Sequence, residues 1–301
     1  MARGGGPPGP AARLRSRDAG ASGSKAVLIT GCSTGIGRAT AEHLAATGHP
    51  VYATARRVES IADLAERGCR TLALDVTDEA SMGAAVDEVV REEDAVGVLV
   101  NNAGYSQSGA LESLPIDGVR RQFETNVFGL LRMCQLALPG MRGQGWGRIV
   151  NVSSMGANFV FPGGGSYHAT KYAVDAMSDA LRFEVTGFGV DVVIVQPGLI
   201  RTEFAETAAA EAGAPAGGPY ASFNASVAKS TRDAYERGPL ARLGGGPEAV
   251  AKAIERAVTS DKPKIRYRVT PSARLLIGQR RLMTAGLWDR MLASQFPRPG
   301  A

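Results

Sequence analysis

The segment from Lys25 to Gly48 most strongly limits the folds open to this chain. Its sequence, KAVLITGCSTGIGRATAEHLAATG, reads as a short buried strand, a glycine turn and a helix with apolar residues at helical spacing. Gly31, Gly35 and Gly37 allow a tight backbone turn, so the helix begins directly at the loop. The free N–H groups and the dipole of that helix point at whatever anion lies there. We therefore expect a pyrophosphate to bind at this turn.

The glycine spacing separates this loop from other phosphate-binding loops. It is GxxxGxG, whereas two-domain dehydrogenases use GxGxxG and P-loop NTPases use GxxxxGK[ST], and no lysine follows here to reach a terminal phosphate. A dinucleotide is therefore favoured over ATP. The alternative is a glycine turn that only joins strand to helix. The residues expected to line the phosphate site are Gly31, Ser33, Thr34, Gly35, Ile36 and Gly37.

Short apolar segments alternate with helical stretches along the rest of the chain. Buried strands separated by helices imply a parallel sheet that is covered on both faces. The predicted fold class is therefore α/β: a doubly wound, Rossmann-type sheet of seven parallel strands with helices on both faces and a C-terminal helical extension. The site is expected at the carboxyl ends of the strands. The strand candidates are residues 26–30, 50–55, 70–76, 96–104, 147–154, 190–198 and 265–269.

The domain organisation follows from composition. The 301 residues, 44% of them apolar, suit one α/β domain with a large core. The opening residues 1–24 are rich in Gly, Pro, Arg and Ser and are expected to be a disordered leader. We predict a single domain at residues 25–270 and a helical tail at residues 271–301.

The second strand ends where a dinucleotide-binding domain reads the adenosine ribose. An Asp or Glu at that point selects NAD, but Ala55 stands here, followed by Arg56 and Arg57. Two guanidinium groups favour a 2′-phosphate through charge-assisted contacts. NADP(H) is therefore the preferred cofactor, with NAD(H) as the alternative. The other interpretation of the two arginines is a solvated strand end.

Tyr167 and Lys171 stand four residues apart in SYHATKYAVDAMSDALRF. On a helix this spacing places a phenol and an ammonium on the same face, one turn apart. The cation is expected to lower the tyrosine pKa, which would let the pair act as an acid/base catalyst near pH 7. His168 is expected to point away from the catalytic face.

Together these features resemble the short-chain dehydrogenase/reductase family, in its compact single-domain branch. Further motifs follow in the family's order between about Lys25 and Thr202: LDVTD, NNAG, FETNVFG, IVNVSSMGA and PGLIRT. The resemblance implies a catalytic tetrad of Asn126, Ser154, Tyr167 and Lys171. It also implies a substrate lid at about residues 199–246 and pairing into a homodimer or homotetramer. The further cofactor contacts that it implies are Asp75, Val76, Asn102, Ala103, Gly104, Tyr167, Lys171, Pro197, Gly198, Ile200 and Thr202.

Each member of the tetrad has a physical role beside the resemblance. Ser154 is expected to stabilise the charge that grows on a carbonyl oxygen, and Tyr167 to protonate that oxygen. Lys171 is expected to hold the nicotinamide ribose, and Asn126 to anchor a water that connects the site to solvent. The alternative for Asn126 is an asparagine that satisfies a kinked helix backbone. Ser153 competes with Ser154, but the offset to Tyr167 favours Ser154.

The late part of the chain suggests a lipophilic substrate. Scattered aromatic residues in the lid region, together with Phe159, Val160 and Phe161, are expected to line an apolar pocket. The tail from residue 271 reads as apolar helices with interspersed arginines, and it resembles tails of steroid and retinol dehydrogenases. Three placements are considered for it, in falling order: over the substrate pocket, at a subunit interface, or on an anionic membrane surface.

These observations predict an NADP(H)-dependent oxidoreductase that transfers hydride between the nicotinamide and a carbonyl or secondary alcohol of a lipophilic substrate. The alternative is an NADP(H)-binding regulator or sensor on the same fold.

Other function classes are not indicated. The formal net charge of +5 is concentrated at the two chain ends, and no nucleic-acid-binding motif accompanies it. The three histidines have no metal-binding spacing, so no metal is expected. Three cysteines without paired spacing fit a reducing cytoplasm, and a redox sensor at Cys32 in the glycine loop is disfavoured.

Overall fold

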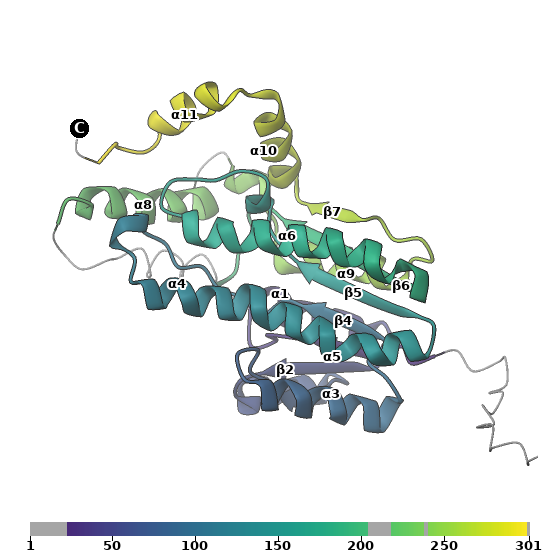
Figure 1. Cartoon of the computed structure of the whole chain (residues 1–301). Helices are drawn as coiled ribbons and strands as arrows, with labels where there is room; N and C mark the ends of the chain where they lie inside the picture. Colours follow the sequence, from purple (N-terminus) through teal and green to yellow (C-terminus); the bar gives the residue numbers. More distant parts are fainter. Residues whose placement is uncertain (1–22, 204–217, 238–239, 300–301) are drawn as a thin grey trace, which may run out of the picture.

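The computed structural model describes residues 23–203, 218–237 and 240–299, and it shows a seven-stranded sheet with helices on both faces (Figure 1). The strand order is β3-β2-β1-β4-β5-β6-β7, and every neighbouring pair is parallel. The predicted fold class is confirmed. The strands are β1 Val27–Ile29, β2 Val51–Ala55, β3 Arg70–Ala73, β4 Val98–Asn101, β5 Gly147–Val152, β6 Val190–Pro197 and β7 Arg266–Val269.

The chain reverses its direction across the sheet between β1 and β4. It first builds β1, β2 and β3 towards one edge, then returns to the other side of β1 and continues outward to β7. The crevice outside the carboxyl ends of the strands at such a switch point is where open α/β sheets bind ligands. The fold therefore places a site at the loops that follow β1 and β4.

Two hydrophobic cores cover the two faces of the sheet. Alternate residues of a strand point to opposite faces, so Val27 and Ile29 pack on one side and Leu28 on the other. Helix α1 (Gly35–Ala46) and helix α9 (Pro247–Thr259) cover the first face. The second face is covered by α3 (Glu79–Glu93), α5 (Leu130–Gly143) and α6 (Gly165–Val185).

A π-helical segment, Glu124–Gly129, joins α4 (Ile116–Phe123) to α5. It contains Asn126. A π turn widens the helix by one residue and is frequent at functional sites.

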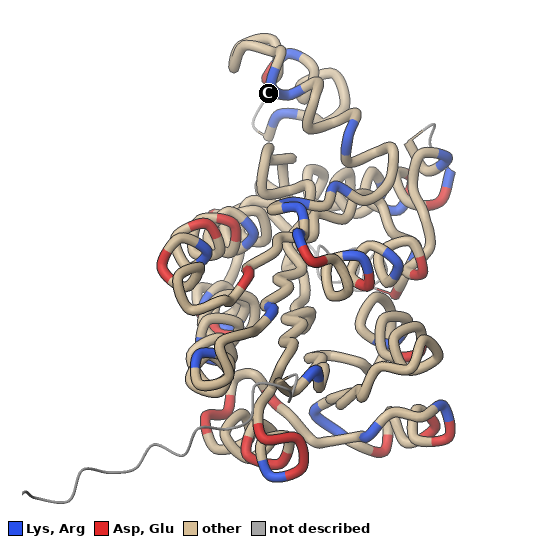
Figure 2. The backbone as a smooth tube through the Cα atoms, turned by 90° about the vertical axis from the view of Figure 1, so that its right-hand side faces the viewer, with Lys and Arg blue, Asp and Glu red and all other residues tan. Residues whose placement is uncertain are grey.

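The late segments lie at the carboxyl end of the sheet. Of the expected lid, residues 204–217 and 238–239 fall outside the described residues, and α8 (Ala221–Glu236) forms half of the rest. Helix α10 (Pro271–Leu282) and helix α11 (Ala285–Ala293) follow β7 and project above the sheet (Figure 1). Basic residues outnumber acidic ones on these two helices (Figure 2). The predicted leader, residues 1–24, lies almost wholly outside the described residues.

No helix in the described ranges is long and apolar enough to span a membrane.

Candidate functional site

A cavity of about 940 Å³ opens at the carboxyl ends of the strands. The loops after β1, β4, β5 and β6 line it, together with residues of α6, α8 and the C-terminal tail. Most of the predicted site residues lie in its wall: Gly31, Ser33, Thr34, Gly35, Ile36, Arg56, Asp75, Val76, Asn102, Ala103, Gly104, Ser154, Tyr167, Lys171, Pro197, Gly198, Ile200 and Thr202. Gly37, Arg57 and Asn126 were also predicted for the site but do not line this cavity.

The glycine loop has the backbone conformation that a phosphate-binding turn requires. Gly31 and Gly35 have φ angles of +74° and +59°, which side chains of L-residues rarely adopt. Helix α1 begins at Gly35 without a side-chain N-cap bond and without an acidic residue in its first turn. Among the described residues, its first N–H groups therefore have no intrahelical or side-chain partner, and they face the cavity with the positive end of the helix dipole.

Gly37 lies beneath the loop rather than in the cavity wall. A Cβ atom built there would lie 2.2 Å from the Gly31 carbonyl oxygen and 2.4 Å from Asn102 Nδ2. That amide nitrogen donates to the carbonyl oxygens of Thr30 and Gly31, each at 3.0 Å. Asn102 thus fastens the end of β4 to the glycine loop, and only glycine leaves room for this contact.

Asn126 supports the loop after β4 from behind. Its Nδ2 donates to the Tyr105 carbonyl oxygen at 2.9 Å and to Thr170 Oγ1 at 3.1 Å, and its Oδ1 accepts from the Tyr105 N–H at 3.1 Å. The Thr170 hydroxyl in turn donates to the Tyr167 carbonyl oxygen at 2.7 Å. These contacts link the π-helical segment to α6 at the level of the tyrosine.

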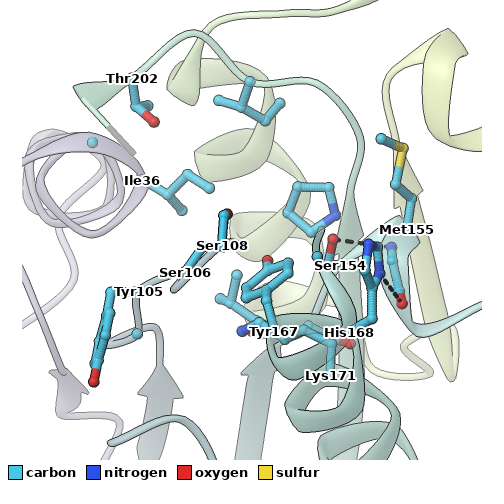
Figure 3. Close-up of a pocket in the computed structure, with 18 of the residues that line it drawn as sticks. Ile36, Tyr105, Ser106, Ser108, Ser154, Met155, Tyr167, His168, Lys171 and Thr202 are labelled. Atoms are coloured by element: carbon cyan, nitrogen blue, oxygen red, sulfur yellow. Dashed lines mark hydrogen bonds between the residues drawn. The ribbon is translucent and has the colours of Figure 1, made fainter. Parts of the chain in front are cut away.

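Ser154 and Tyr167 meet in the cavity (Figure 3). Ser154 follows β5, and its hydroxyl accepts from the Gly156 N–H at 3.0 Å. A hydrogen bond between the Ser154 and Tyr167 side chains lowers the pKa of Tyr167, but burial acts more strongly and raises it well above the usual value. The phenol is therefore protonated at neutral pH.

The pKa of Tyr167 is raised by burial, whereas the sequence had suggested that Lys171 would lower it. The Lys171 ammonium donates to the Val152 carbonyl oxygen at 3.0 Å and lies 5.7 Å from the centre of the Tyr167 ring. Burial lowers the pKa of Lys171 to about 8, and the Asp175 carboxylate acts against this effect. The effect of burial exceeds the attraction of the Asp175 carboxylate because the Lys171 side chain is buried.

Asp175 distinguishes Ser153 from Ser154. Ser153 donates to Asp175 Oδ1 at 2.5 Å, and Gln196 Nε2 donates to Oδ2 at 2.8 Å. The Ser153 hydroxyl is thus engaged with this carboxylate, while Ser154 pairs with Tyr167. Sequence reasoning missed Asp175, although it stands four residues after Lys171 on α6 and repeats the Tyr–Lys spacing.

His168 lines the cavity, so the expectation that it points away was wrong. Its Nδ1 donates to the Gly156 carbonyl oxygen at 2.8 Å, and its Nε2 accepts from the Phe161 N–H at 3.4 Å. Burial lowers the pKa of His168, in agreement with a neutral ring. The loop after β5 folds onto this flank of α6, so two neighbouring faces of the helix point inward (Figure 3).

The C-terminal tail forms part of the cavity wall. Trp288 of α11 is buried, stacks on Phe161 at 6.0 Å between ring centres, and donates from Nε1 to the Val160 carbonyl oxygen at 3.4 Å. Gln295 and Phe296, which follow α11, line the cavity. Of the three placements considered for the tail, the structure shows the one over the pocket.

Cys32 is buried, and burial raises the pKa of its thiol to about 12. This opposes thiolate formation and hence a redox function at the loop.

Comparison with known proteins identifies relatives. The sequence model described as short chain dehydrogenase matches residues 25–213. The uncharacterized oxidoreductase YbbO of Escherichia coli K12 is 34% identical over 269 residues, 89% of this chain and 94% of that protein. The 3-ketodihydrosphingosine reductase of Bacteroides thetaiotaomicron is 41% identical over 60% of this chain and 65% of its own length. The NADPH-dependent 3-dehydrocapnine reductase of Ornithobacterium rhinotracheale is 32% identical over 81% of this chain and 87% of its own length.

Solved structures have the same fold. A short-chain dehydrogenase from Streptomyces avermitilis superimposes with a TM-score of 0.71 at 32% identity, over 91% of this chain and 95% of that one. A serine dehydrogenase complexed with NADP+ superimposes with a TM-score of 0.70 at 26% identity, over 82% of this chain and 94% of that one.

Proposed function

The chain belongs to the short chain dehydrogenase family, and we propose that it reduces a carbonyl group of a lipophilic substrate with NADPH. As a member of this family it is an oxidoreductase that uses a nicotinamide cofactor and acts on CH–OH or C=O groups. The observation that carries the proposal is the hydrogen-bonded pair of hydroxyls, Ser154 and Tyr167, in the cavity that the glycine loop also lines.

The residues present fit an NADP(H) molecule. The uncapped start of α1 and the positive φ angles of Gly31 and Gly35 provide the cradle for the pyrophosphate. Arg56 lines the cavity beyond the end of β2, where Ala55 leaves no carboxylate to bind the ribose 2′-hydroxyl. This arrangement favours a 2′-phosphate, and therefore NADP(H) over NAD(H).

The protonation state of the site favours reduction. The bound nicotinamide supplies the hydride. Ser154 donates a hydrogen bond to the carbonyl oxygen and stabilises the negative charge that develops on it. Tyr167, protonated at neutral pH because burial raises its pKa, delivers the proton to the same oxygen. We assign Lys171 to the ribose hydroxyls of the cofactor, and Asn126 to the polar connection between the site and solvent.

The walls of the cavity away from the glycine loop support a lipophilic substrate. They are formed by side chains of the loop after β5, the lid region and the tail: Phe159, Phe161, Leu199, Leu240, Leu276 and Phe296. Two of the relatives are named as reductases of 3-ketodihydrosphingosine and 3-dehydrocapnine. We therefore propose a ketone that carries a long hydrocarbon chain, and we propose that α8 is part of a lid over it.

The test begins with cofactor binding. Fluorescence titration of the full chain should show tighter binding of NADPH than of NADH. NADPH consumption is then followed with 3-ketodihydrosphingosine and with simple long-chain ketones. Tyr167→Phe should bind NADPH normally but lose about 10²- to 10⁴-fold in kcat because the proton donor is removed. A Tyr167→Phe protein that turns over ketone as fast as the wild type would exclude this chemistry. The alternative, a dinucleotide-sensing regulator, is not favoured because all four tetrad positions are filled.

Assembly and location are further proposals. Phe183, Tyr172 and Phe128 are exposed on α6 and the π-helical segment, with Phe183 at 84% of its full exposure. Tyr172 and Phe183 stand eleven residues apart on α6 and therefore share one face of that helix. Exposed apolar side chains that form a patch mark protein contacts, so we propose a homodimer or homotetramer that pairs through these helices, and we propose a cytoplasmic location. Mass photometry of wild type and Phe183→Glu tests the pairing.

A further inference from the structure

Helix α8 presents one continuous face to the cavity. The cavity-lining residues of this helix are Val227, Ser230, Thr231, Ala234 and Tyr235. Their spacing, i, i+3, i+4, i+7 and i+8, is that of a single helix face. The first part of this face is apolar, whereas the part nearer the C-terminal end carries three hydroxyl groups.

The three hydroxyl groups lie in a cavity wall that is otherwise largely apolar. The tail and the loop after β5 contribute Phe159, Phe161, Leu276 and Phe296 to it, beside the polar side chain of Gln295. The side chains of Ser230, Thr231 and Tyr235 are half-buried, and within the described ranges their hydroxyls make no hydrogen bond to the protein. Hydroxyls in this position are available to a polar atom of a ligand.

Tyr235 is the α8 residue that packs against the segment following Ser154. Its ring packs with the cluster that contains Phe159, Leu199 and Leu276, which fixes its position against the tail. Tyr235 and Tyr167 line the same cavity, and the Tyr235 phenol adds to the rise in the pKa of Tyr167. Burial raises the pKa of Tyr235 itself to about 12, and the group therefore remains a neutral hydrogen-bond donor at physiological pH.

From this placement we infer that Ser230, Thr231 and Tyr235 recognise a hydroxyl or amino substituent on the carbon next to the reacting carbonyl. The substrate class is then an amphiphilic ketone, with its polar substituent against α8 and its hydrocarbon chain against the tail. This inference rests on the proposed function and specifies its substrate. Tyr235 acts in it as a specificity-determining residue, since Tyr167 remains the proton donor.

The experiment compares two ketones that differ in one group. One is a long-chain methyl ketone, and the other is the same ketone with a hydroxyl on the carbon next to the carbonyl. The ratio of their kcat/KM values with NADPH is measured for the wild type, for Tyr235→Phe and for Ser230→Ala/Thr231→Val. One lost hydrogen bond of about 1 to 1.5 kcal/mol corresponds to a roughly 5- to 13-fold fall in the ratio. We expect the wild type to prefer the hydroxyketone, and both variants to lose that preference by about this factor.

Tyr220→Phe is the matched control. Tyr220 stands at the start of the same helix, but its hydroxyl donates to Glu112 outside the cavity, and Tyr220 is not in the cavity wall. This variant should keep the wild-type ratio. Equal losses on both ketones in Tyr235→Phe would mean that the phenol supports only the fold of the lid, and they would overturn the inference.

A binding measurement separates the inference from the proposed function. Both ketones are titrated calorimetrically into the protein saturated with NADP+. The ratio of their Kd values then measures the preference for the hydroxyketone without any turnover. Absence of turnover with an intact affinity ratio would reject the proposed reaction and keep the recognition by α8. Turnover with no preference for the hydroxyketone would reject the recognition and keep the reaction.

Discussion

Replacing Gly37 by alanine should damage both the fold and the cofactor site, because this glycine lies where β1, β4 and α1 come together. The added Cβ atom would lie 2.2 Å from the Gly31 carbonyl oxygen and 2.4 Å from Asn102 Nδ2. Neighbouring atoms must move to make room for the Cβ atom, and a shift of the glycine-loop backbone costs more free energy than a shift of a side chain. The two hydrogen bonds from Asn102 to Thr30 and Gly31 are the contacts most directly displaced.

The expected change in the free energy of unfolding combines two losses and one gain. Loss of two hydrogen bonds costs roughly 2 kcal/mol, and overpacking costs roughly 1 to 3 kcal/mol. Alanine regains about 1 kcal/mol over glycine in a helix. The net loss in the free energy of unfolding is therefore roughly 2 to 4 kcal/mol, which for a domain of this size lowers Tm by roughly 5 to 15 °C.

Gly83→Ala is the matched control. Gly83 also lies inside a helix, α3, but a Cβ atom built there meets nothing within 4 Å. This variant should be as stable as the wild type or more stable by up to about 1 kcal/mol. Urea unfolding measures both variants, and NADPH titration of Gly37→Ala should show at least about tenfold weaker binding, since a displaced loop no longer aims its N–H groups at the pyrophosphate. Equal stabilities of Gly37→Ala and Gly83→Ala would refute the argument from close approach.

Three further variants test the site. Arg56→Ala should raise the Kd for NADPH by roughly 10- to 100-fold and leave NADH binding unchanged. Arg57 lies outside the cavity wall, so Arg57→Ala should raise the Kd for NADPH less. Equal effects of the two variants in the titration would contradict the assignment of Arg56 to the 2′-phosphate. In the wild type, the free energy of unfolding should rise with pH between about 8 and 10.4, by up to about 1.4 kcal/mol per pH unit, because the unfolded chain still binds a proton at Lys171 that the folded state has released. Lys171→Met should remove this rise, and urea unfolding at the two ends of the pH window measures it. Trp288→Ala should raise KM for a long-chain ketone several-fold without altering the Kd for NADPH, and a weakened NADPH affinity would show that the tail supports more than the substrate wall.

The sheet and the cofactor loop were predictable because their signals are local. Buried strands, helical spacing and the glycine turn are each set within about twenty residues, and the order of a doubly wound sheet follows once they alternate. Many of the residues expected in the cavity wall, such as Gly31 and Ser154, stand just after the end of a strand. Their positions are fixed by the ends of the strands themselves.

The parts that could not be predicted depend on contacts between distant segments. Asn126 binds the backbone of Tyr105, and nothing in the FETNVFG motif indicates a π-helical segment there. His168 faces the cavity only because the loop after β5 folds onto its flank of α6. The pKa of Tyr167 was expected to fall through its neighbour Lys171, but burial, which a helix pattern does not reveal, decides the sign.

The two ends of the cavity are built from different parts of the chain, and this division bears on specificity. The cofactor end is formed by the ends of β1, β2 and β4, which belong to the rigid sheet, whereas the substrate end is formed by α8, α10 and the residues after α11. Helix α10 and helix α11 touch the sheet mainly at its last strand and at the loop after β5. Changes in these late segments can therefore reshape the substrate wall while the glycine loop and the Ser154–Tyr167 pair keep their geometry. Under the proposed function, we therefore expect the sheet and α6 to determine the cofactor and the reaction, and the late helices to determine which ketone is accepted.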